Sequence, residues 1–149
     1  MGLEYFQRYH EKPWPNYQKI LEANGEVIIK KHEVGKDGWT DLDDWMHGDS
    51  ILKSGSSIIR PDLKTCGNYG GPVKITQLTD DRVDLDCFDF LDCRGNRVLY
   101  RMSLSKARDL YKEGKWYQTV NEKVNDKKSG LIRFPTEIIK SNSKELRST

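Results

Sequence analysis

The stretch from Val73 to Met102 reads VKITQLTDDRVDLDCFDFLDCRGNRVLYRM, and its apolar residues alternate with polar ones in three short runs. Residues 79–81 and 94–96 separate these runs and contain Asp, Gly and Asn, which are typical of turns. A period of two is the pattern of a half-buried strand, because successive side chains point to opposite faces. The stretch therefore predicts a meander of three antiparallel strands whose apolar positions are Val73, Ile75, Val83, Leu85, Cys87, Val98, Tyr100 and Met102.

A helix is predicted directly after this meander. Ser103 or Ser105 can cap its N-terminus, and Gly114 is suited to end it. The apolar residues between these limits recur at helical spacing, at Leu104, Ala107, Leu110 and Tyr111. One helix is therefore expected to pack its apolar face on the sheet.

The rest of the chain predicts shorter elements. Short helices are expected over 3–10 and from Asn16 through Leu21, and strands over 27–34, 39–42, 57–60 and 131–134, with most of 47–72 in loops. Together these elements predict an α+β, β-rich fold with short N-terminal helices. Its centre would be a curved antiparallel sheet or a small SH3-like barrel with one helix packed on it.

The length and composition indicate one domain. The chain has 149 residues, of which 36% are hydrophobic and 32% are charged, so the supply of core residues is small. Four Trp, seven Tyr and four Phe residues enlarge that supply, because each aromatic side chain buries a large area. We expect a single domain over residues 1–140 and a disordered tail over residues 141–149, where apolar residues are nearly absent.

The chain is expected to be cytoplasmic and not to engage a membrane. No run approaches the roughly 20 apolar residues that a membrane span needs. The N-terminus lacks the basic and then apolar order of a signal peptide. Cys66, Cys87 and Cys93 are odd in number and cannot all pair, which favours reduced thiols.

No motif for catalysis, metal binding or a cofactor is recognised. The glycine-rich stretch Gly67–Gly71 lacks the Gly-Lys-Ser/Thr of a phosphate loop. Cys66 beside it would need a base such as His47 to act as a nucleophile. The acidic residues within 41–49 and 80–92 do not have EF-hand spacing, and a solvated surface is the expectation for both groups. We therefore assign no catalytic residue, metal ligand or cofactor.

Charge is divided unevenly along the chain. Residues 94–149 carry 14 Lys and Arg against 6 Asp and Glu, whereas residues 1–93 carry 11 against 17. In the basic half, six cations are expected to share one face of the third strand and the helix, and Trp116 or Tyr117 could add a stacking surface. Tyr69, at the tip of the glycine-rich loop, could contact a ligand. The predicted binding residues are Arg94, Arg97, Arg101, Arg108, Lys112, Lys115, Trp116 and Tyr69.

These patterns favour a small non-enzymatic binding module whose basic face engages nucleic acid or an acidic protein surface. A second hypothesis makes the acidic first half the working surface of an inhibitor, of accessory or mobile-element type, that blocks a host enzyme acting on nucleic acid. A third hypothesis places a thiol-dependent enzyme or a small-ligand pocket near Cys66 and Tyr69. The charge pattern leaves all three open.

Overall fold

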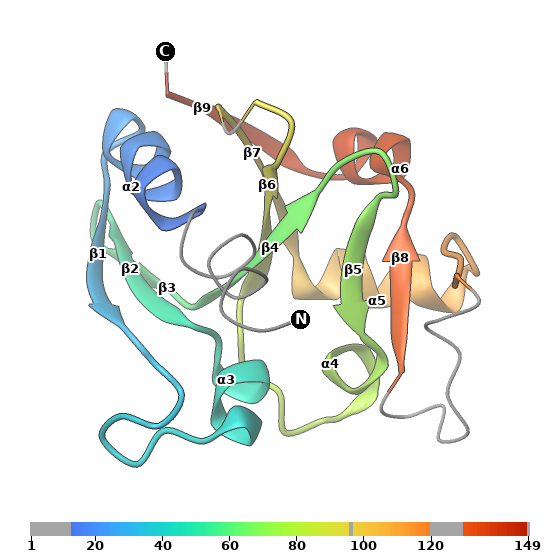
Figure 1. Ribbon diagram of the computed structural model, residues 1–149, viewed down its shortest axis with the longest axis horizontal. Coiled ribbons are helices and arrows are strands. Elements are labelled where there is room, and N and C mark those ends of the chain that lie inside the picture. Colours follow the sequence, from blue (N-terminus) through green and yellow to red (C-terminus); the bar gives the residue numbers. More distant parts are fainter. Residues whose placement is uncertain (1–12, 96, 120–129, 149) are drawn as a thin grey trace.

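The computed structural model describes residues 13–95, 97–119 and 130–148, which form five helices and nine strands (Figure 1). The helices are α2 (Pro13–Ala23), α3 (Asp41–His47), α4 (Ile75–Thr79), α5 (Leu104–Lys112) and α6 (Thr136–Ser141). The strands are β1 (Glu26–Lys31), β2 (Ser50–Ser54), β3 (Ser57–Ile59), β4 (Pro61–Cys66), β5 (Gly71–Lys74), β6 (Cys87–Asp92), β7 (Val98–Ser103), β8 (Leu131–Phe134) and β9 (Lys144–Arg147). The fold is α+β and rich in strands.

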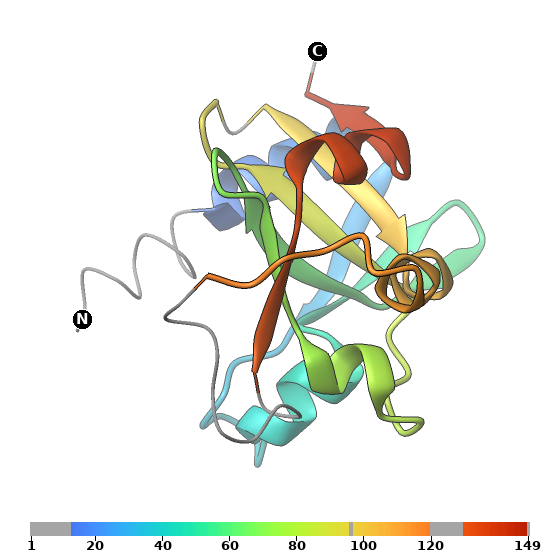
Figure 2. The same ribbon diagram turned by 90° about the vertical axis from the view of Figure 1, so that its right-hand side faces the viewer.

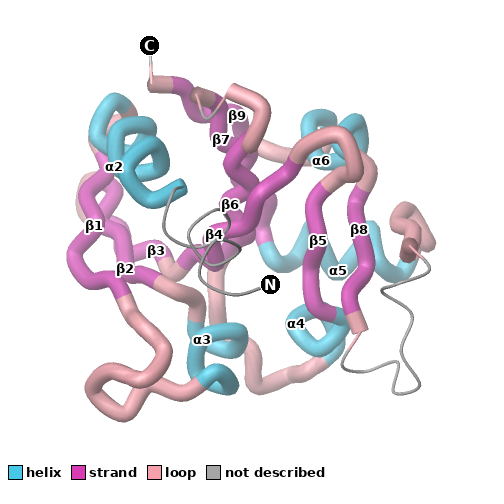
Figure 3. Tube along the Cα trace, viewed as in Figure 1, coloured by secondary structure: helices cyan, strands magenta, loops and turns pink. Residues whose placement is uncertain are grey.

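The strands form three sheets, with helices around them (Figure 3). One sheet has the order β1-β2-β3, a second β4-β6-β7-β9, and a third pairs β5 with β8. All pairings are antiparallel except that of β4 with β6, which is parallel. None of these sheets closes into a barrel among the described residues, so the predicted SH3-like barrel is not confirmed.

The sheet containing β6 separates two hydrophobic cores. Phe88 and Phe90 of β6 belong to the larger core, to which α5, β5 and β8 contribute. Leu91 points the other way, into a smaller core built with Tyr17 of α2, Leu52 of β2 and Leu146 of β9. Because both faces of β6 are covered, five of its six residues are buried, including Asp89.

The N-terminal half contains more strands than predicted. The second predicted helix is present as α2 but begins at Pro13, and β1 confirms the strand predicted over 27–34. The strand predicted over 39–42 is wrong, because Thr40 caps α3 there. Strand β1 instead pairs with β2, inside the stretch expected to be mostly loop. The helix predicted over 3–10 lies outside the described residues.

The predicted meander is only partly present. Its third strand is present as β7. Its first strand ends at Lys74, where the chain continues as α4. Ile75 and Leu78 lie on the same side of α4 and enter the larger core. Residues 83–86 are not in a strand, although Val83 and Leu85 are buried. The alternation of apolar and polar residues over 83–86 therefore reflects which side chains are buried, although the segment is not a strand.

The C-terminal segment agrees with prediction except at its end. Helix α5 starts at the Ser103 cap, and β8 forms where a closing strand was expected. The predicted disordered tail is wrong, because β9 pairs with β7 and only 3% of Leu146 is exposed. No helix in the described ranges is both long and apolar enough to span a membrane.

Candidate functional site

Arg101, predicted to lie on a basic surface, is instead part of a buried ionic network. Its Nη1 and Nη2 donate to the two carboxylate oxygens of Glu26, both at 2.8 Å, and its Nε donates to Asp89 Oδ1 at 2.8 Å. The hydroxyl group of Tyr17 donates to Asp89 Oδ2 at 2.6 Å. The Arg101 side chain is 11% exposed, because its position on β7 faces the smaller core and not solvent.

This network links α2, β1, β6 and β7. Burial alone would lower the pKa of Arg101, but the carboxylates of Asp89 and Glu26 outweigh burial and raise it. Burial, together with Asp89, raises the pKa of Tyr17 well above its usual value. Arg101 therefore stays charged and is a structural residue.

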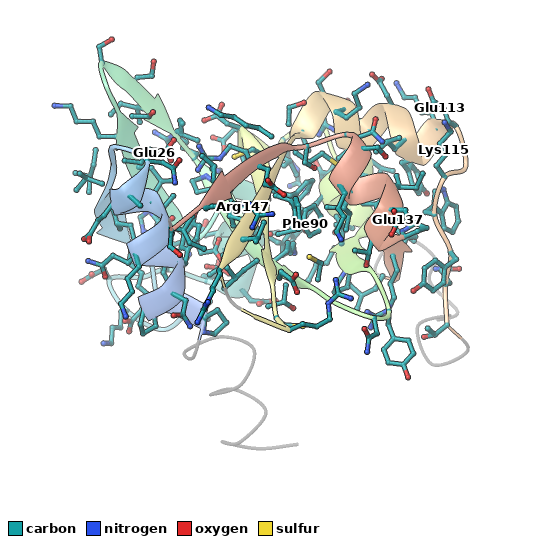
Figure 4. The ribbon with its side chains drawn as sticks, turned by 90° about the horizontal axis from the view of Figure 1, so that it is seen from above. Glu26, Phe90, Glu113, Lys115, Glu137 and Arg147 are labelled. Atoms are coloured by element: carbon teal, nitrogen blue, oxygen red, sulfur yellow. The ribbon has the colours of Figure 1, made fainter. Side chains whose placement is uncertain are left out.

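The other predicted cations lie in separate places. Arg94 is in the turn before β7, paired with Asp92, and Arg97 is exposed just before the strand. The six residues of β7 separate them from the start of α5 by about 20 Å. Lys112 and Lys115 are exposed at the far end of α5; in Figure 4, Lys115 and Glu113 lie on the opposite side of the molecule from Glu26. The six cations do not form one continuous face.

Two further predicted residues on this segment have packing roles. Arg108 is half-buried and its Nη2 donates to the Asp80 carbonyl at 3.1 Å. Trp116 is half-buried, stacks on Tyr111 with ring centroids 5.4 Å apart, and donates its Nε1 to the Tyr111 carbonyl. Neither side chain is arranged as a free stacking surface.

The structure does bring Tyr69 and Arg94 to the same region. Tyr69 is 74% exposed in the 67–70 turn, and Arg94 Nη1 lies 3.4 Å from the Asn68 side-chain oxygen in the same turn. Both Asn68 and Arg94 line a pocket of about 330 Å³, together with Gly67, Gly70, Tyr117, Pro135, Thr136, Glu137 and Lys140. This is the part of the predicted binding set that the fold assembles.

Two residues of the predicted acidic surface over 41–49 meet a third carboxylate in a partly buried cluster. Oxygen atoms of Asp44, Asp49 and Asp62 all lie within 4.8 Å of one another. Asp62 is 4% exposed, and Asp44 and Asp49 are half-buried. The expectation of a solvated surface is therefore wrong for Asp44 and Asp49, and Asp62 lay outside both predicted acidic groups.

Local structure explains how these carboxylates meet. Asp44 is on α3, which a capping box between Thr40 and Asp43 begins. After α3, Gly48 has a φ of 84°, and a Cβ there would lie 2.4 Å from the Pro61 carbonyl oxygen. This close approach to the start of β4 places Asp49 beside Asp62.

Hydrogen bonds fix the two central carboxylates. The backbone N–H of Leu63 donates to both oxygens of Asp49, at 3.0 and 3.2 Å. Asp62 Oδ2 accepts from Lys64 Nζ at 2.8 Å and from Gln77 Nε2 at 2.8 Å. Gln77 is fully buried, and its Oε1 has no hydrogen-bond partner among the described residues. The side-chain amide of Gln77 therefore contacts the carboxylate cluster and also has an oxygen that accepts no hydrogen bond from the described residues.

The pKa values of this pair move in opposite directions. Burial and the neighbouring charge of Asp62 raise the pKa of Asp49 well above its usual value. Burial alone would raise the pKa of Asp62, but Lys64 and hydrogen bonds from Asp49 and Gln77 outweigh burial and lower it. The two carboxyl groups therefore titrate together, and Asp49 is the member that takes up a proton more readily.

The cluster opens onto a pocket of about 280 Å³ that also contains cations. Lys64 and Lys74 line it, as do Asp41, Asp44, Trp45, Asp49, Asp62, Leu63, Thr65, Pro72 and Leu131. One feature of the sequence indicates this site. Asp62 and Lys64 are two residues apart in one strand, so their side chains share a face.

Cys66 does not have the setting of a catalytic thiol. It is buried, and burial raises its pKa to about 12, with the charge of Asp92 as a further cause. His47, the base considered for it, has its Nδ1 2.9 Å from Asp84 Oδ1 instead. Comparisons with known proteins add no assignment, because no family model, curated protein or solved structure matches the chain.

Proposed function

We propose that the protein binds a divalent cation at Asp44, Asp49 and Asp62 and uses it to hydrolyse a phosphodiester bond in nucleic acid. The observation that carries this proposal is the meeting of three carboxylates with Lys64 and the Gln77 amide beside an open pocket. Carboxylate oxygens are the ligands that Mg²⁺ and similar hard cations prefer.

The charges of the cluster suit a divalent ion. When all are ionised, three carboxylates and Lys64 carry a net charge of −2, from three negative charges and one positive. A divalent cation would neutralise that charge and compete with protonation of Asp49, whose pKa is raised by burial and by Asp62. Gln77 contacts Asp62 through Nε2, and its buried Oε1 has no hydrogen-bond partner among the described residues.

The positive charges in the pocket suit a phosphate group. Lys64 Nζ is 2.8 Å from Asp62 Oδ2, so it would lie next to a cation bound there, and Lys74 lines the same pocket. The cation would polarise a phosphoryl oxygen and acidify a bound water, and Lys64 would stabilise the charge that develops on the phosphate. The water oxygen bonds to phosphorus as the bond to one ester oxygen breaks. One water hydrogen ends on the released hydroxyl group and the other on the phosphate.

The test combines cation binding with cleavage. Isothermal titration with Mg²⁺ and Mn²⁺ should show a site that Asp62→Asn removes and that Asp109→Asn, a change at an exposed position on α5, leaves intact. Because protonation of Asp49, which its raised pKa favours, competes with the cation, the affinity for the cation should rise with pH. Lys64→Met should keep cation binding but lower the rate of oligonucleotide cleavage by about 10²–10³. Cleavage that persists in excess chelator, or in folded Asp62→Asn, would contradict the proposal.

A non-enzymatic nucleic-acid-binding module is the second candidate. The exposed ring of Tyr69, in the turn that Arg94 contacts through Asn68, favours it. It predicts binding that needs neither a cation nor Asp62, and no cleavage under any condition. The inhibitor hypothesis is supported only by the uneven charge distribution along the sequence.

A further inference from the structure

The outward face of β5 and β8 joins the two pockets. In their antiparallel register Pro72 is opposite Arg133 and Lys74 is opposite Leu131. An isolated bridge places Tyr117 opposite Arg133 on the other side of β8. Residues that are directly opposite in a sheet share a face, and the intervening Val73 and Ile132 are fully buried on the inner face. The two strands lie side by side in Figures 1 and 2.

This outward face extends from the carboxylate pocket to the 67–70 turn. Lys74, Pro72 and Leu131 line the carboxylate pocket, and Tyr117 lines the pocket beside Arg94 and Lys140. The four residues of β5 span about 13 Å, so both pockets lie within reach of a short stretch of extended chain. The ends of the path and its middle carry cations: Lys64 and Lys74, then Arg133, then Arg94 and Lys140. The first pocket also contains Asp41, Asp44, Asp49 and Asp62, and the second contains Glu137. These cations attract a phosphate backbone along the path, and the backbone would enter the carboxylate pocket itself only where a bound divalent cation offsets the acidic side chains.

The turn that carries Tyr69 is held firmly, although its ring is exposed. The backbone groups of Gly67 and Gly70 bond to each other in both directions, at 3.3 and 3.2 Å. Thr136 Oγ1 donates to the Gly67 carbonyl at 2.6 Å, and the Tyr69 carbonyl accepts from the Tyr117 hydroxyl group and, at 3.4 Å, from Arg133 Nη1. An aromatic ring on a backbone that is already ordered loses little entropy on binding. Its open face can stack on an unpaired base, which a duplex does not present.

We propose that the protein binds single-stranded nucleic acid along this face, with one base stacked on Tyr69 and the backbone directed over Lys74 toward the carboxylate pocket. The substrate of the proposed hydrolysis is then a single strand, and this assignment of the substrate rests on the proposed function. The binding itself does not depend on it. Tyr69 is a specificity-determining residue that selects unpaired bases and takes no part in bond breaking.

Binding is measured in chelator, so that neither cation nor cleavage contributes. A fluorescent oligothymidine of about 12 nucleotides and a duplex of equal length serve as probes in anisotropy titrations. Wild type should bind the single strand more tightly than the duplex, and Tyr69→Ala should weaken single-strand binding by roughly 5- to 150-fold. Tyr69→Trp should retain binding because it keeps an aromatic face. Ile58→Ala, on the exposed face of β3 and 53% exposed in the parent, should have no effect.

The stacking itself has a separate readout. A 2-aminopurine base placed in the oligonucleotide should lose fluorescence on binding to wild type and to Tyr69→Trp, and not with Tyr69→Ala. Equal single-strand affinity for wild type and Tyr69→Ala would overturn the proposal, as would tighter binding of the duplex. If titration of the wild type with Mg²⁺ and Mn²⁺ shows no cation site while Tyr69→Ala still weakens single-strand binding, the proposed hydrolysis fails and the single-strand surface stands.

Discussion

Replacing Arg101 with Gln should be among the most damaging changes in the described chain. The substitution removes the guanidinium group that pairs with both Glu26 and Asp89, whose side chains are 4% and 0% exposed. Two carboxylates would then be buried without a cation. Breaking a buried pair in this way costs about 3–5 kcal/mol. At about 2–4 °C per kcal/mol for a chain of this size, the melting temperature should fall by roughly 6–20 °C.

The assay is thermal and urea unfolding of the variant beside a matched control. Lys112→Gln removes a cation that is exposed at the end of α5, and its stability should stay within about 0.5 kcal/mol of the parent. Adding Glu26→Gln and Asp89→Asn to Arg101→Gln should recover part of the loss, because the buried charges are then absent. If Arg101→Gln unfolds with the same midpoint as Lys112→Gln, the network does not hold α2, β1, β6 and β7 together and the reasoning is wrong.

Two further predictions concern stability, both read from melting temperatures. Gly70→Ala should destabilise by at least about 1–2 kcal/mol, because φ is +76° and the new Cβ would lie 2.3 Å from the Phe134 carbonyl oxygen. Gly55→Ala is its control, with φ +60° and no atom within 4 Å, so equal losses would show that the close contact is unimportant. Ending the chain after Lys140 should lower stability by about 2 kcal/mol or more, because β9 and the buried side chain of Leu146 are lost. An unchanged midpoint would show that β9 contributes nothing.

The sequence predicted those elements whose signals are local. Ser103 and the apolar spacing from Leu104 define α5 without reference to the rest of the fold. The alternation around Val98 likewise identified β7. The prediction of loops over most of 47–72 was wrong, because glycine and proline there suggested turns. The strands in this stretch are stabilised by partners distant in sequence, such as β6 beside β4. Tertiary pairing outweighed local preference at these positions.

The candidate site was harder to predict, because charged residues look alike in a sequence whether buried or exposed. Arg101 follows the same alternation as a solvent-facing residue would, and only the position of Glu26 on β1 shows that its face is covered. Asp49 and Asp62 are separated by the β2–β3 hairpin and meet because Gly48 lets the chain pass close to Pro61. Tyr69 was predicted correctly to lie at an exposed loop tip, since glycines on both sides mark a tight turn.

The composition of the smaller core has a consequence for how the chain folds. Tyr17 and Leu146, which come from opposite ends of the described chain, both contribute to it, and β9 completes the sheet on the outer side of β7. Contacts between residues so distant in sequence close large loops, and folding slows as such contacts come to dominate. Much of the larger core comes from β5, α4, β6, β7 and α5, which follow one another closely in the sequence, and this part can assemble first. Refolding experiments should therefore show α5 and β7 gaining hydrogen-exchange protection before α2 and β1, with the Arg101 network forming last.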